Sequence, residues 1–152
     1  MKTELQNIIL ASTSFERDRV LNLEETYELT TEIEISHAFS RKKYLIVEFV
    51  YKANFSLNKK ASNRNKITYN SKHVAQFKID DFNEQNEEDL LVAERFANIN
   101  AAAMIFPFIR ENAATISAKA GMSPLIIPIT NFVKIFEDKK QKEKQEYIKP
   151  KK

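Results

Sequence analysis

The chain has 152 residues, a net charge of +3, one glycine and no cysteine. This length suits one domain with a real core, and the missing cysteine excludes disulfides and thiol chemistry. A single glycine also excludes the glycine-rich loops that bind nucleotide phosphates. The longest apolar run, residues 101–109, is far shorter than the ~20 residues of a membrane span, and the N-terminal residues lack the apolar run of a signal peptide. We therefore expect a soluble, cytoplasmic protein with no membrane insertion.

Four segments alternate between apolar and polar residues with a period of two, which is typical of strands with one buried face. They cover residues 5–16, 27–35, 45–57 and 67–79. Strands with one solvent-exposed face belong to antiparallel sheets. The polar, turn-rich link over residues 58–66 predicts a hairpin between the third and fourth strands.

After Asn83 the apolar residues recur every three or four positions, as they do in a helix. Asn86 is expected to cap the start of this helix, ahead of three acidic residues that suit the positive end of the helix dipole. Pro107 is expected to kink or restart it, and Gly121 to end it as a left-handed cap. A second helix is predicted to begin near Asn131 and to fade into a Lys-rich tail.

The two predicted helices are joined by an apolar connector, residues 122–130 (MSPLIIPIT), which we call the strap. Pro124 and Pro128 hold it extended, because proline fixes φ and disfavours a helical residue before it. Connectors usually lie on the surface and are polar. Two explanations stay open: half of the strap plugs the core while a subunit contact hides the rest, or the strap walls an exposed groove that binds something.

The excess positive charge lies at the C-terminal end. Of the 24 bases and 21 acids, seven lysines and four acids lie from Glu137 onward, so 17 bases and 17 acids precede it. Such a tail is typical of a solvated or frayed segment. A nucleic-acid-binding tail would need aromatic residues between its bases, and Tyr147 is the only aromatic residue here.

The residue patterns give no support for an enzyme. His37 and His73 are expected at strand ends, without the spacing of a metal-binding motif around them. The acids of the second strand, Glu28, Glu32 and Glu34, are expected to form a solvated face, and no Ser-His-Asp set can be picked out. We therefore expect no catalytic residues, no bound metal and no cofactor.

From the long helix through the strap, the chain resembles the SecB family of export chaperones. The matching residues are Phe106, Pro107, Phe108, Arg110 and Glu111, then Pro124, Leu125, Pro128, Asn131 and Phe132, and the first strand ends on a similar Thr13–Glu16 segment. The resemblance covers residues 5 to 137. It implies an α+β fold, in which a four-stranded antiparallel Greek-key sheet packs with a long helix and a second, C-terminal helix. The chaperone domain would span residues 1–138, followed by a mobile, Lys-rich tail over residues 139–152.

The resemblance also implies an ATP-independent chaperone (holdase) that holds unfolded or aggregation-prone polypeptides in apolar grooves, as in protein export. Family members assemble as homotetramers, each a dimer of dimers. The residues expected to bind a client are Met122, Pro124, Leu125, Ile127, Pro128, Phe132, Phe49, Tyr51 and Phe77. Contacts between subunits are expected on the long helix, at Phe96, Ile99, Ala103, Phe106 and Ile109.

Two departures from the family leave the partner open. Export-type members have acidic surfaces and a tail that docks the SecA motor, whereas this tail is Lys-rich. A tryptophan that often contributes to client binding is absent, and residues 16–26 (ERDRVLNLEET) occupy its region. The alternatives are therefore an export holdase that binds unfolded preproteins, or a dedicated chaperone of an antitoxin. A third, less favoured alternative is a nucleic-acid-binding module that uses the basic tail.

Overall fold

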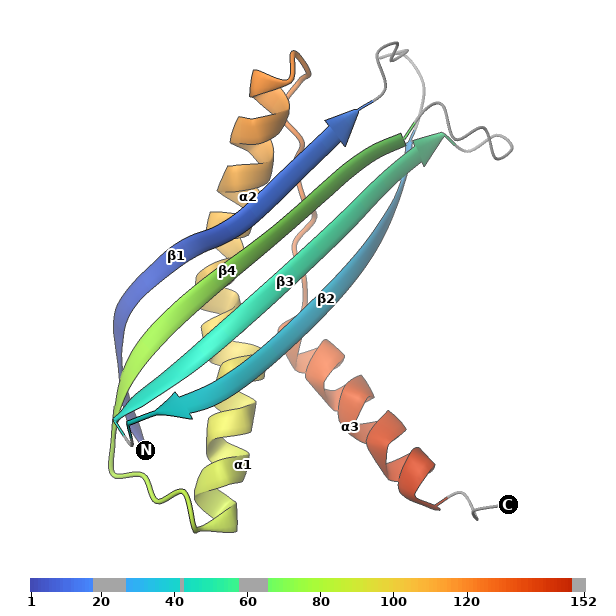
Figure 1. The fold of residues 1–152 in the computed structure, drawn as a ribbon. Helices are drawn as coiled ribbons and strands as arrows, with labels where there is room; N and C mark the ends of the chain where they lie inside the picture. Colours follow the sequence, from blue (N-terminus) through green and yellow to red (C-terminus); the bar gives the residue numbers. More distant parts are fainter. Residues whose placement is uncertain (18–26, 42, 58–65, 149–152) are drawn as a thin grey trace.

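The computed structural model describes residues 1–17, 27–41, 43–57 and 66–148. A single sheet lies on one side of the molecule, and the helices cover one of its faces (Figure 1). The sheet contains β1 (Lys2–Arg17), β2 (Tyr27–Ser40), β3 (Tyr44–Leu57) and β4 (Lys66–Asp80). The helical layer contains α1 (Glu87–Arg95), the π-helix η1 (Phe96–Ala101), α2 (Ala102–Lys119) and α3 (Phe132–Ile148).

The sheet has the strand order β1-β4-β3-β2, and every neighbouring pair is antiparallel. Because β1 lies beside β4 rather than beside β2, which follows it along the chain, the topology is a Greek key. This confirms the predicted fold. The strands are longer than expected, since β1 begins at Lys2 and β2 continues to Ser40. The predicted hairpin link lies largely outside the described residues, but its two strands are paired as expected.

The core lies between the sheet and the helices. Alternate residues of the central strands β3 and β4 are buried on this face, from Leu45 to Ala53 and from Ile67 to Ile79. Apolar residues of the edge strands are only half-buried there, among them Ile8 and Ile33. The opposite face of the sheet carries mostly polar residues, together with the half-buried apolar residues Ile46, Val50 and Val74.

The long helix begins where the sequence predicts. The Asn86 side chain accepts a hydrogen bond of 2.9 Å from the backbone N–H of Glu88, which satisfies one of the free amides of the first turn. Acidic residues 87–89 follow this cap. The expected interruption at Pro107 is wrong in its position, because α2 does not restart there. Pro107 and Ala103 are both exposed, so solvent can hydrogen-bond the carbonyl that the proline leaves without a partner.

The irregularity lies earlier, in η1. The Asn98 side chain donates a hydrogen bond of 2.8 Å to the carbonyl oxygen of Glu94, four residues before it. That carbonyl is the one to which the Asn98 backbone N–H would bond in an α-helix, so the side chain competes with the helical ladder. Asn98 is itself buried, beside Ala97 and Ala101. The wider turn therefore coincides with a polar side chain that is held inside the protein.

Candidate functional site

The strap is fixed to α2 at two points. The buried hydroxyl of Ser117 accepts a hydrogen bond of 2.8 Å from the Leu125 backbone N–H and itself donates to the carbonyl of Ala113. Arg110 Nε donates a hydrogen bond of 2.9 Å to the carbonyl of Ile127. These bonds hold one edge of an extended segment against the helix, and the prolines keep the segment from coiling.

The turn into the strap is built around Gly121, which has a φ of 78°. The N–H of Met122 bonds to the carbonyl of Ser117, and the N–H of Gly121 bonds to that of Ala118. This pair of bonds is a Schellman motif, in which glycine avoids the cost of a left-handed backbone. Arg17 of β1 donates a further hydrogen bond of 2.8 Å to the carbonyl of Ala120. The predicted helix end at Gly121 is confirmed.

The strap has one buried and one exposed side. Ile127 is 1% exposed and belongs to the core, whereas Ile126 is 78% exposed and Ile129 is 86% exposed. Exposed isoleucines gain nothing for the stability of a single chain. Both explanations offered by the sequence therefore hold in part: one side of the strap plugs the core, and the other presents apolar residues to the surroundings.

A groove of about 360 Å³ lies between the end of the strap, the start of α3 and the edge strand β2. Its apolar lining comes from Leu29, Pro128, Ile129 and Ile135. Its polar lining comes from Thr31, Tyr51, Thr130, Asn131 and Lys134. The groove therefore combines an apolar wall with a cluster of hydrogen-bond donors.

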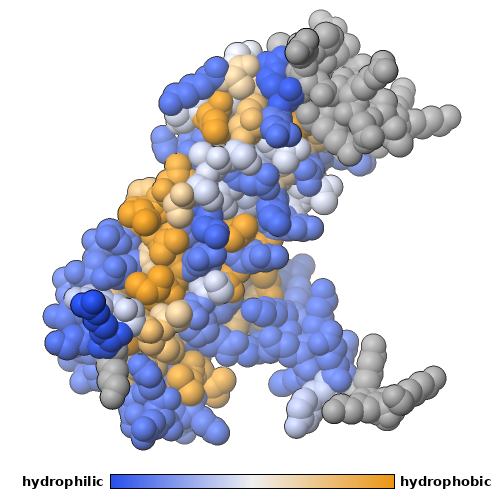
Figure 2. All heavy atoms as spheres, in the orientation of Figure 1, coloured by the Kyte–Doolittle hydropathy of each residue, from blue (hydrophilic) through white to orange (hydrophobic). Residues whose placement is uncertain are grey.

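A second apolar surface lies along β1. Leu5 and Leu10 are 44% and 45% exposed, and Ile9 is 51% exposed. Figure 2 shows this band as hydrophobic residues that run along the left side of the molecule. Met104 and Phe108 of α2 are also exposed, at 44% and 49%. Apolar patches of this kind on soluble proteins usually bind a partner.

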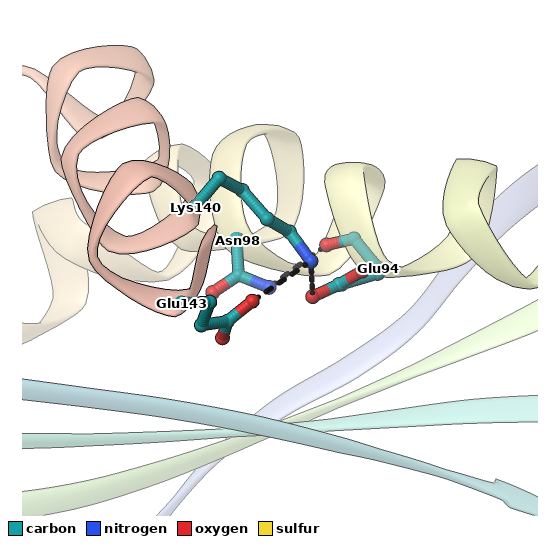
Figure 3. A network of polar contacts seen from close by, with 4 residues as sticks. All are labelled: Glu94, Asn98, Lys140 and Glu143. Atoms are coloured by element: carbon teal, nitrogen blue, oxygen red, sulfur yellow. Dashed lines mark hydrogen bonds and ion pairs between the residues drawn. The ribbon is translucent and has the colours of Figure 1, made fainter. Parts of the chain in front are cut away.

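The third feature is the junction between α3 and the long helix. Lys140 Nζ lies 2.6 Å from a carboxylate oxygen of Glu94 and 3.4 Å from one of Glu143, beside the Asn98 amide (Figure 3). The hydrogen bond that Lys140 donates to Glu94 raises the pKa of Lys140 above its ordinary value. Phe136 is buried at the same junction. These contacts fix the first half of α3, while Tyr147 near its end is 94% exposed.

α3 extends into the segment that was expected to be a tail. The second helix was expected to fade into a mobile tail after residue 138, but α3 continues to Ile148 and includes Lys140. The pairing of Lys140 with Glu94 gives the first part of this segment a structural role. Residues 149–152 lie outside the described residues.

Burial shifts the pKa values of two titratable side chains of the sheet, Tyr51 and His73. Burial raises the pKa of Tyr51 to about 12, with the neighbouring Tyr69 as a smaller cause, so Tyr51 stays protonated at neutral pH. Burial lowers the pKa of His73, against a smaller opposing effect of Glu111, and its Nδ1 atom has no hydrogen-bond partner. No group of three acids, histidines or cysteines within the described residues is arranged to hold a metal ion.

The residues expected to bind a client fall into two groups. Met122 and Leu125 are half-buried and Pro124 and Pro128 are exposed, so a partner can reach them on the strap. The others are buried in the core of the single chain, namely Ile127, Phe132, Phe49, Tyr51 and Phe77. Their binding role stays a prediction, and of these five only Tyr51 lines the groove beside the strap.

The residues expected to lie between subunits also fall into two groups, according to their burial within one chain. Phe106 and Ile109 are 6% and 0% exposed and pack against the sheet within one chain. Phe96 and Ile99 are half-buried, and Ala103 is exposed. The sequence pattern had placed Val92 and Phe106 on one helical face, but Val92 is 48% exposed. An unbroken 3.6-residue period cannot follow the chain through the wider turn of η1.

Several surface residues were missed by the sequence reading. Ile126 and Ile129 are the most exposed apolar residues of the strap, and simple alternation could not have indicated both, because it would place Ile129 on the side of the buried Ile127. Leu5 and Leu10 follow the period of β1 poorly, because bulges shift its register between Leu5 and Asn7 and between Leu10 and Ser12. A simple period of two cannot reveal which face such residues occupy.

Comparison with known proteins identifies the family. The family model described as preprotein translocase subunit SecB matches residues 2–143 of this chain. The chain belongs to the SecB family. A curated SecB protein, the protein-export protein of Anaplasma phagocytophilum, is 32% identical over 66 residues. That match spans 43% of this chain and 40% of the relative.

Solved structures confirm the SecB fold. The Mycobacterium tuberculosis SecB-like chaperone Rv1957, solved with a ChAD peptide from the HigA1 antitoxin, aligns with a TM-score of 0.70 and 16% identity. The alignment covers 85% of this chain and 91% of that one. A Streptococcus agalactiae protein of unknown function aligns with a TM-score of only 0.41 and 8% identity, over 85% of this chain and 98% of that one, which carries no argument. Within the described residues, no helix is long and apolar enough to cross a membrane.

Proposed function

We propose that this SecB-family chain is an ATP-independent chaperone that holds unfolded or aggregation-prone polypeptides along the strap and its groove. The observation that carries the proposal is the exposure of Ile126 and Ile129 on a segment that hydrogen bonds hold against α2. A fixed apolar edge can bind an extended chain without first folding itself, which limits the ordering cost of binding.

Apolar contact supplies enough free energy for holding. A client segment that removes about 400 Å² of apolar surface from water gains on the order of 10 kcal/mol before ordering costs. The net affinity is much smaller than this gain, which suits capture followed by release. Holding of this kind needs no catalytic group, so we expect no enzymatic activity, and we place the protein in the cytoplasm.

The β1–α2 surface supports assembly with further copies of the chain. It combines the exposed residues Leu5 and Leu10, on the helix-covered face of the sheet, with Met104 and Phe108, and β1 is an edge strand with unpaired backbone groups along one side. We propose that this surface, rather than the core residues Phe106 and Ile109, provides most of the subunit contact. The expected assembly is a homotetramer, and a monomer mass at micromolar concentration would contradict it.

The client proposal is tested by making the strap edge acidic. The double variant Ile126→Asp/Ile129→Asp should keep the fold and the assembly but lose capture of a permanently unfolded protein, as measured by light scattering of the mixture. The matched control is Asn54→Asp on the solvent-exposed face of the sheet, which keeps the oxygen that accepts from Thr68. Equal capture by both variants would place the binding surface elsewhere.

A dedicated antitoxin partner is the second candidate. It is favoured by the solved SecB-like structure, which holds an antitoxin peptide, and by the Lys-rich C-terminal segment, which departs from the acidic surfaces of export-type members. A dedicated chaperone should ignore general unfolded proteins yet bind one partner. SecA stays an untested partner, and a nucleic-acid role for the tail would be indicated by steep loss of binding with added salt.

A further inference from the structure

The polar side chains that line the groove beside the strap include hydrogen-bond donors and one positive charge but no negative charge. None of its lining residues is acidic, although it is lined by Lys134, by three side chains with hydroxyl groups and by the start of α3. A purely apolar client would leave these donors without partners when it covers them. Buried donors without partners cost free energy, so the groove favours a ligand that can accept hydrogen bonds.

The position of Tyr51 gives the strongest support for a ligand that accepts hydrogen bonds. Its side chain is only 1% exposed, yet it lines the groove. Its hydroxyl makes no hydrogen bond with any residue that the structure describes. Burial raises the pKa of Tyr51 further above neutral pH, to about 12, so its hydroxyl carries a proton that it can donate. A hydroxyl without a partner among the described residues, on a side chain that lines an open groove, is placed to bond a ligand.

The start of α3 adds positive potential at the same place. Asn131 caps the helix, with its side chain accepting from the Lys134 N–H at 3.1 Å, and this cap does not use the amides of Phe132 and Val133. The first turn of this 17-residue helix contains no acidic residue to offset its dipole. The Lys134 side chain forms no ion pair with a described residue. The dipole, the ammonium group and the hydroxyl therefore all favour a negative ligand.

We propose that the groove uses its lining residues Tyr51, Asn131 and Lys134 to bind the carboxylate of an Asp or Glu side chain within an apolar client segment. The inference rests on the proposed client-binding function and adds the chemistry by which a client is selected. The apolar neighbours of that carboxylate would pack on Leu29, Ile129 and Ile135.

A side-chain carboxylate fits the geometry better than the C-terminus of a client. The strap is extended, and Ile126 and Ile129 present exposed apolar groups along it before the chain reaches Asn131. A client that follows these residues therefore passes the polar end of the groove with its backbone continuing on both sides. An acidic side chain can reach Tyr51 and Lys134 from such a segment without ending the chain.

The test uses two short apolar peptides with blocked ends that differ only by Glu or Gln at one position. Charge-assisted hydrogen bonds to a carboxylate should make the full-length protein bind the Glu peptide about five- to tenfold more tightly at low ionic strength, as measured by fluorescence anisotropy. Lys134→Gln should reduce this preference to below about twofold, and Tyr51→Phe should weaken it while keeping the aromatic ring. The matched control, Lys142→Gln, removes the same charge from α3 outside the groove and should leave the preference unchanged.

The outcomes separate this inference from the function on which it rests. Equal binding of both peptides, with capture of unfolded protein intact, would overturn the carboxylate site and leave the chaperone proposal standing. Stronger binding of a Gln peptide with a free C-terminus than of the blocked Glu peptide would overturn the assignment to a side chain. Failure to bind either peptide or any unfolded protein would overturn both proposals.

Discussion

The strap and the inner face of the sheet are both built from apolar residues, but only one of them is removed from water. On β3 and β4 the apolar side chains are buried by the helices, and the backbone is fully paired with neighbouring strands. Beyond the turn at Gly121, the described residues give the strap two anchoring hydrogen bonds, and the side chains of Ile126 and Ile129 are exposed. Hydrophobicity alone therefore does not distinguish a core from an apolar surface. The two regions differ in how many backbone hydrogen bonds hold them and in whether helices cover their side chains.

The strap itself contains the sharpest version of this comparison, in two adjacent isoleucines. Ile127→Asp would bury an unpaired charge in the core and should lower the free energy of unfolding by about 3–5 kcal/mol. Ile126→Asp should change it by less than about 0.5 kcal/mol, because that side chain is already in water. Urea unfolding of the two variants measures both values. Similar losses in both would mean that the two sides of the strap are not distinct.

The next largest effect is expected at the anchor between the strap and α2. Ser117→Ala would leave the Leu125 N–H without its partner and should cost about 1–3 kcal/mol. Amide hydrogen exchange should also become faster along the strap than on β3. The matched control is Ser123→Ala, since Ser123 is exposed. Unchanged exchange at Leu125 would contradict an anchoring role for Ser117.

Acid should act on the sheet and not on the strap, because residues 122–131 contain no titratable side chain. Burial lowers the pKa of His73 in the folded chain, so the unfolded chain binds that proton more tightly. The stability that neutral His73 allows is complete above its ordinary pKa of 6.5 and falls as the pH drops below it. The slope is limited to about 1.4 kcal/mol per pH unit for one group. His73→Gln should flatten this slope in urea unfolding curves measured at several pH values.

His37 is a second histidine whose pKa burial lowers. It lies near Glu94 and Lys139, whose charges oppose one another in their effect on the ring. His37→Gln should remove its own share of the slope and leave the share that belongs to His73. A slope that His73→Gln leaves unchanged would contradict the effect assigned to the burial of His73.

The smallest effect is expected at the junction of α3. Lys140→Met would remove the ion pair with Glu94, and because both side chains are partly exposed the cost should stay below about 1 kcal/mol. Added salt should lower the free energy of unfolding of the wild-type protein until it approaches that of the variant. Lys144→Met is the matched control, since no described residue forms an ion pair with Lys144. A loss of several kcal/mol would mean that α3 belongs to the core rather than to the periphery.

Much of the fold could be predicted because strands and helices have different periods. The alternation from Leu45 to Leu57, the cap at Asn86 and the stop at Gly121 each have a local physical cause, and all three lie where expected. The site could be predicted only in outline. Which isoleucine of the strap faces the core depends on the hydrogen bonds that Ser117 and Arg110 make with the strap. Both residues lie on α2, so the sequence of the strap alone does not show these contacts.

The helix phase could not be predicted, for a different reason. Asn98 reads as an ordinary polar residue on a helix surface, but in the folded chain it is buried and its amide bonds to the Glu94 carbonyl. Only the packed structure shows that its side chain competes with the backbone. The π-helix then places Val92 and Phe106 on different faces, which a regular period cannot anticipate.

That wider turn has a consequence for how the long helix can vary between relatives. A π-helical turn is closed by bonds between residues five apart, one more than in an α-helix, so it behaves as an insertion that the helix absorbs without a loop. Deleting one residue within Phe96–Ala101 should restore a regular α-helical turn there and leave α1 and α2 with the same faces towards the protein. A relative with a regular helix here should therefore align with a single-residue gap inside continuous helix, and Asn98 indicates where that gap belongs.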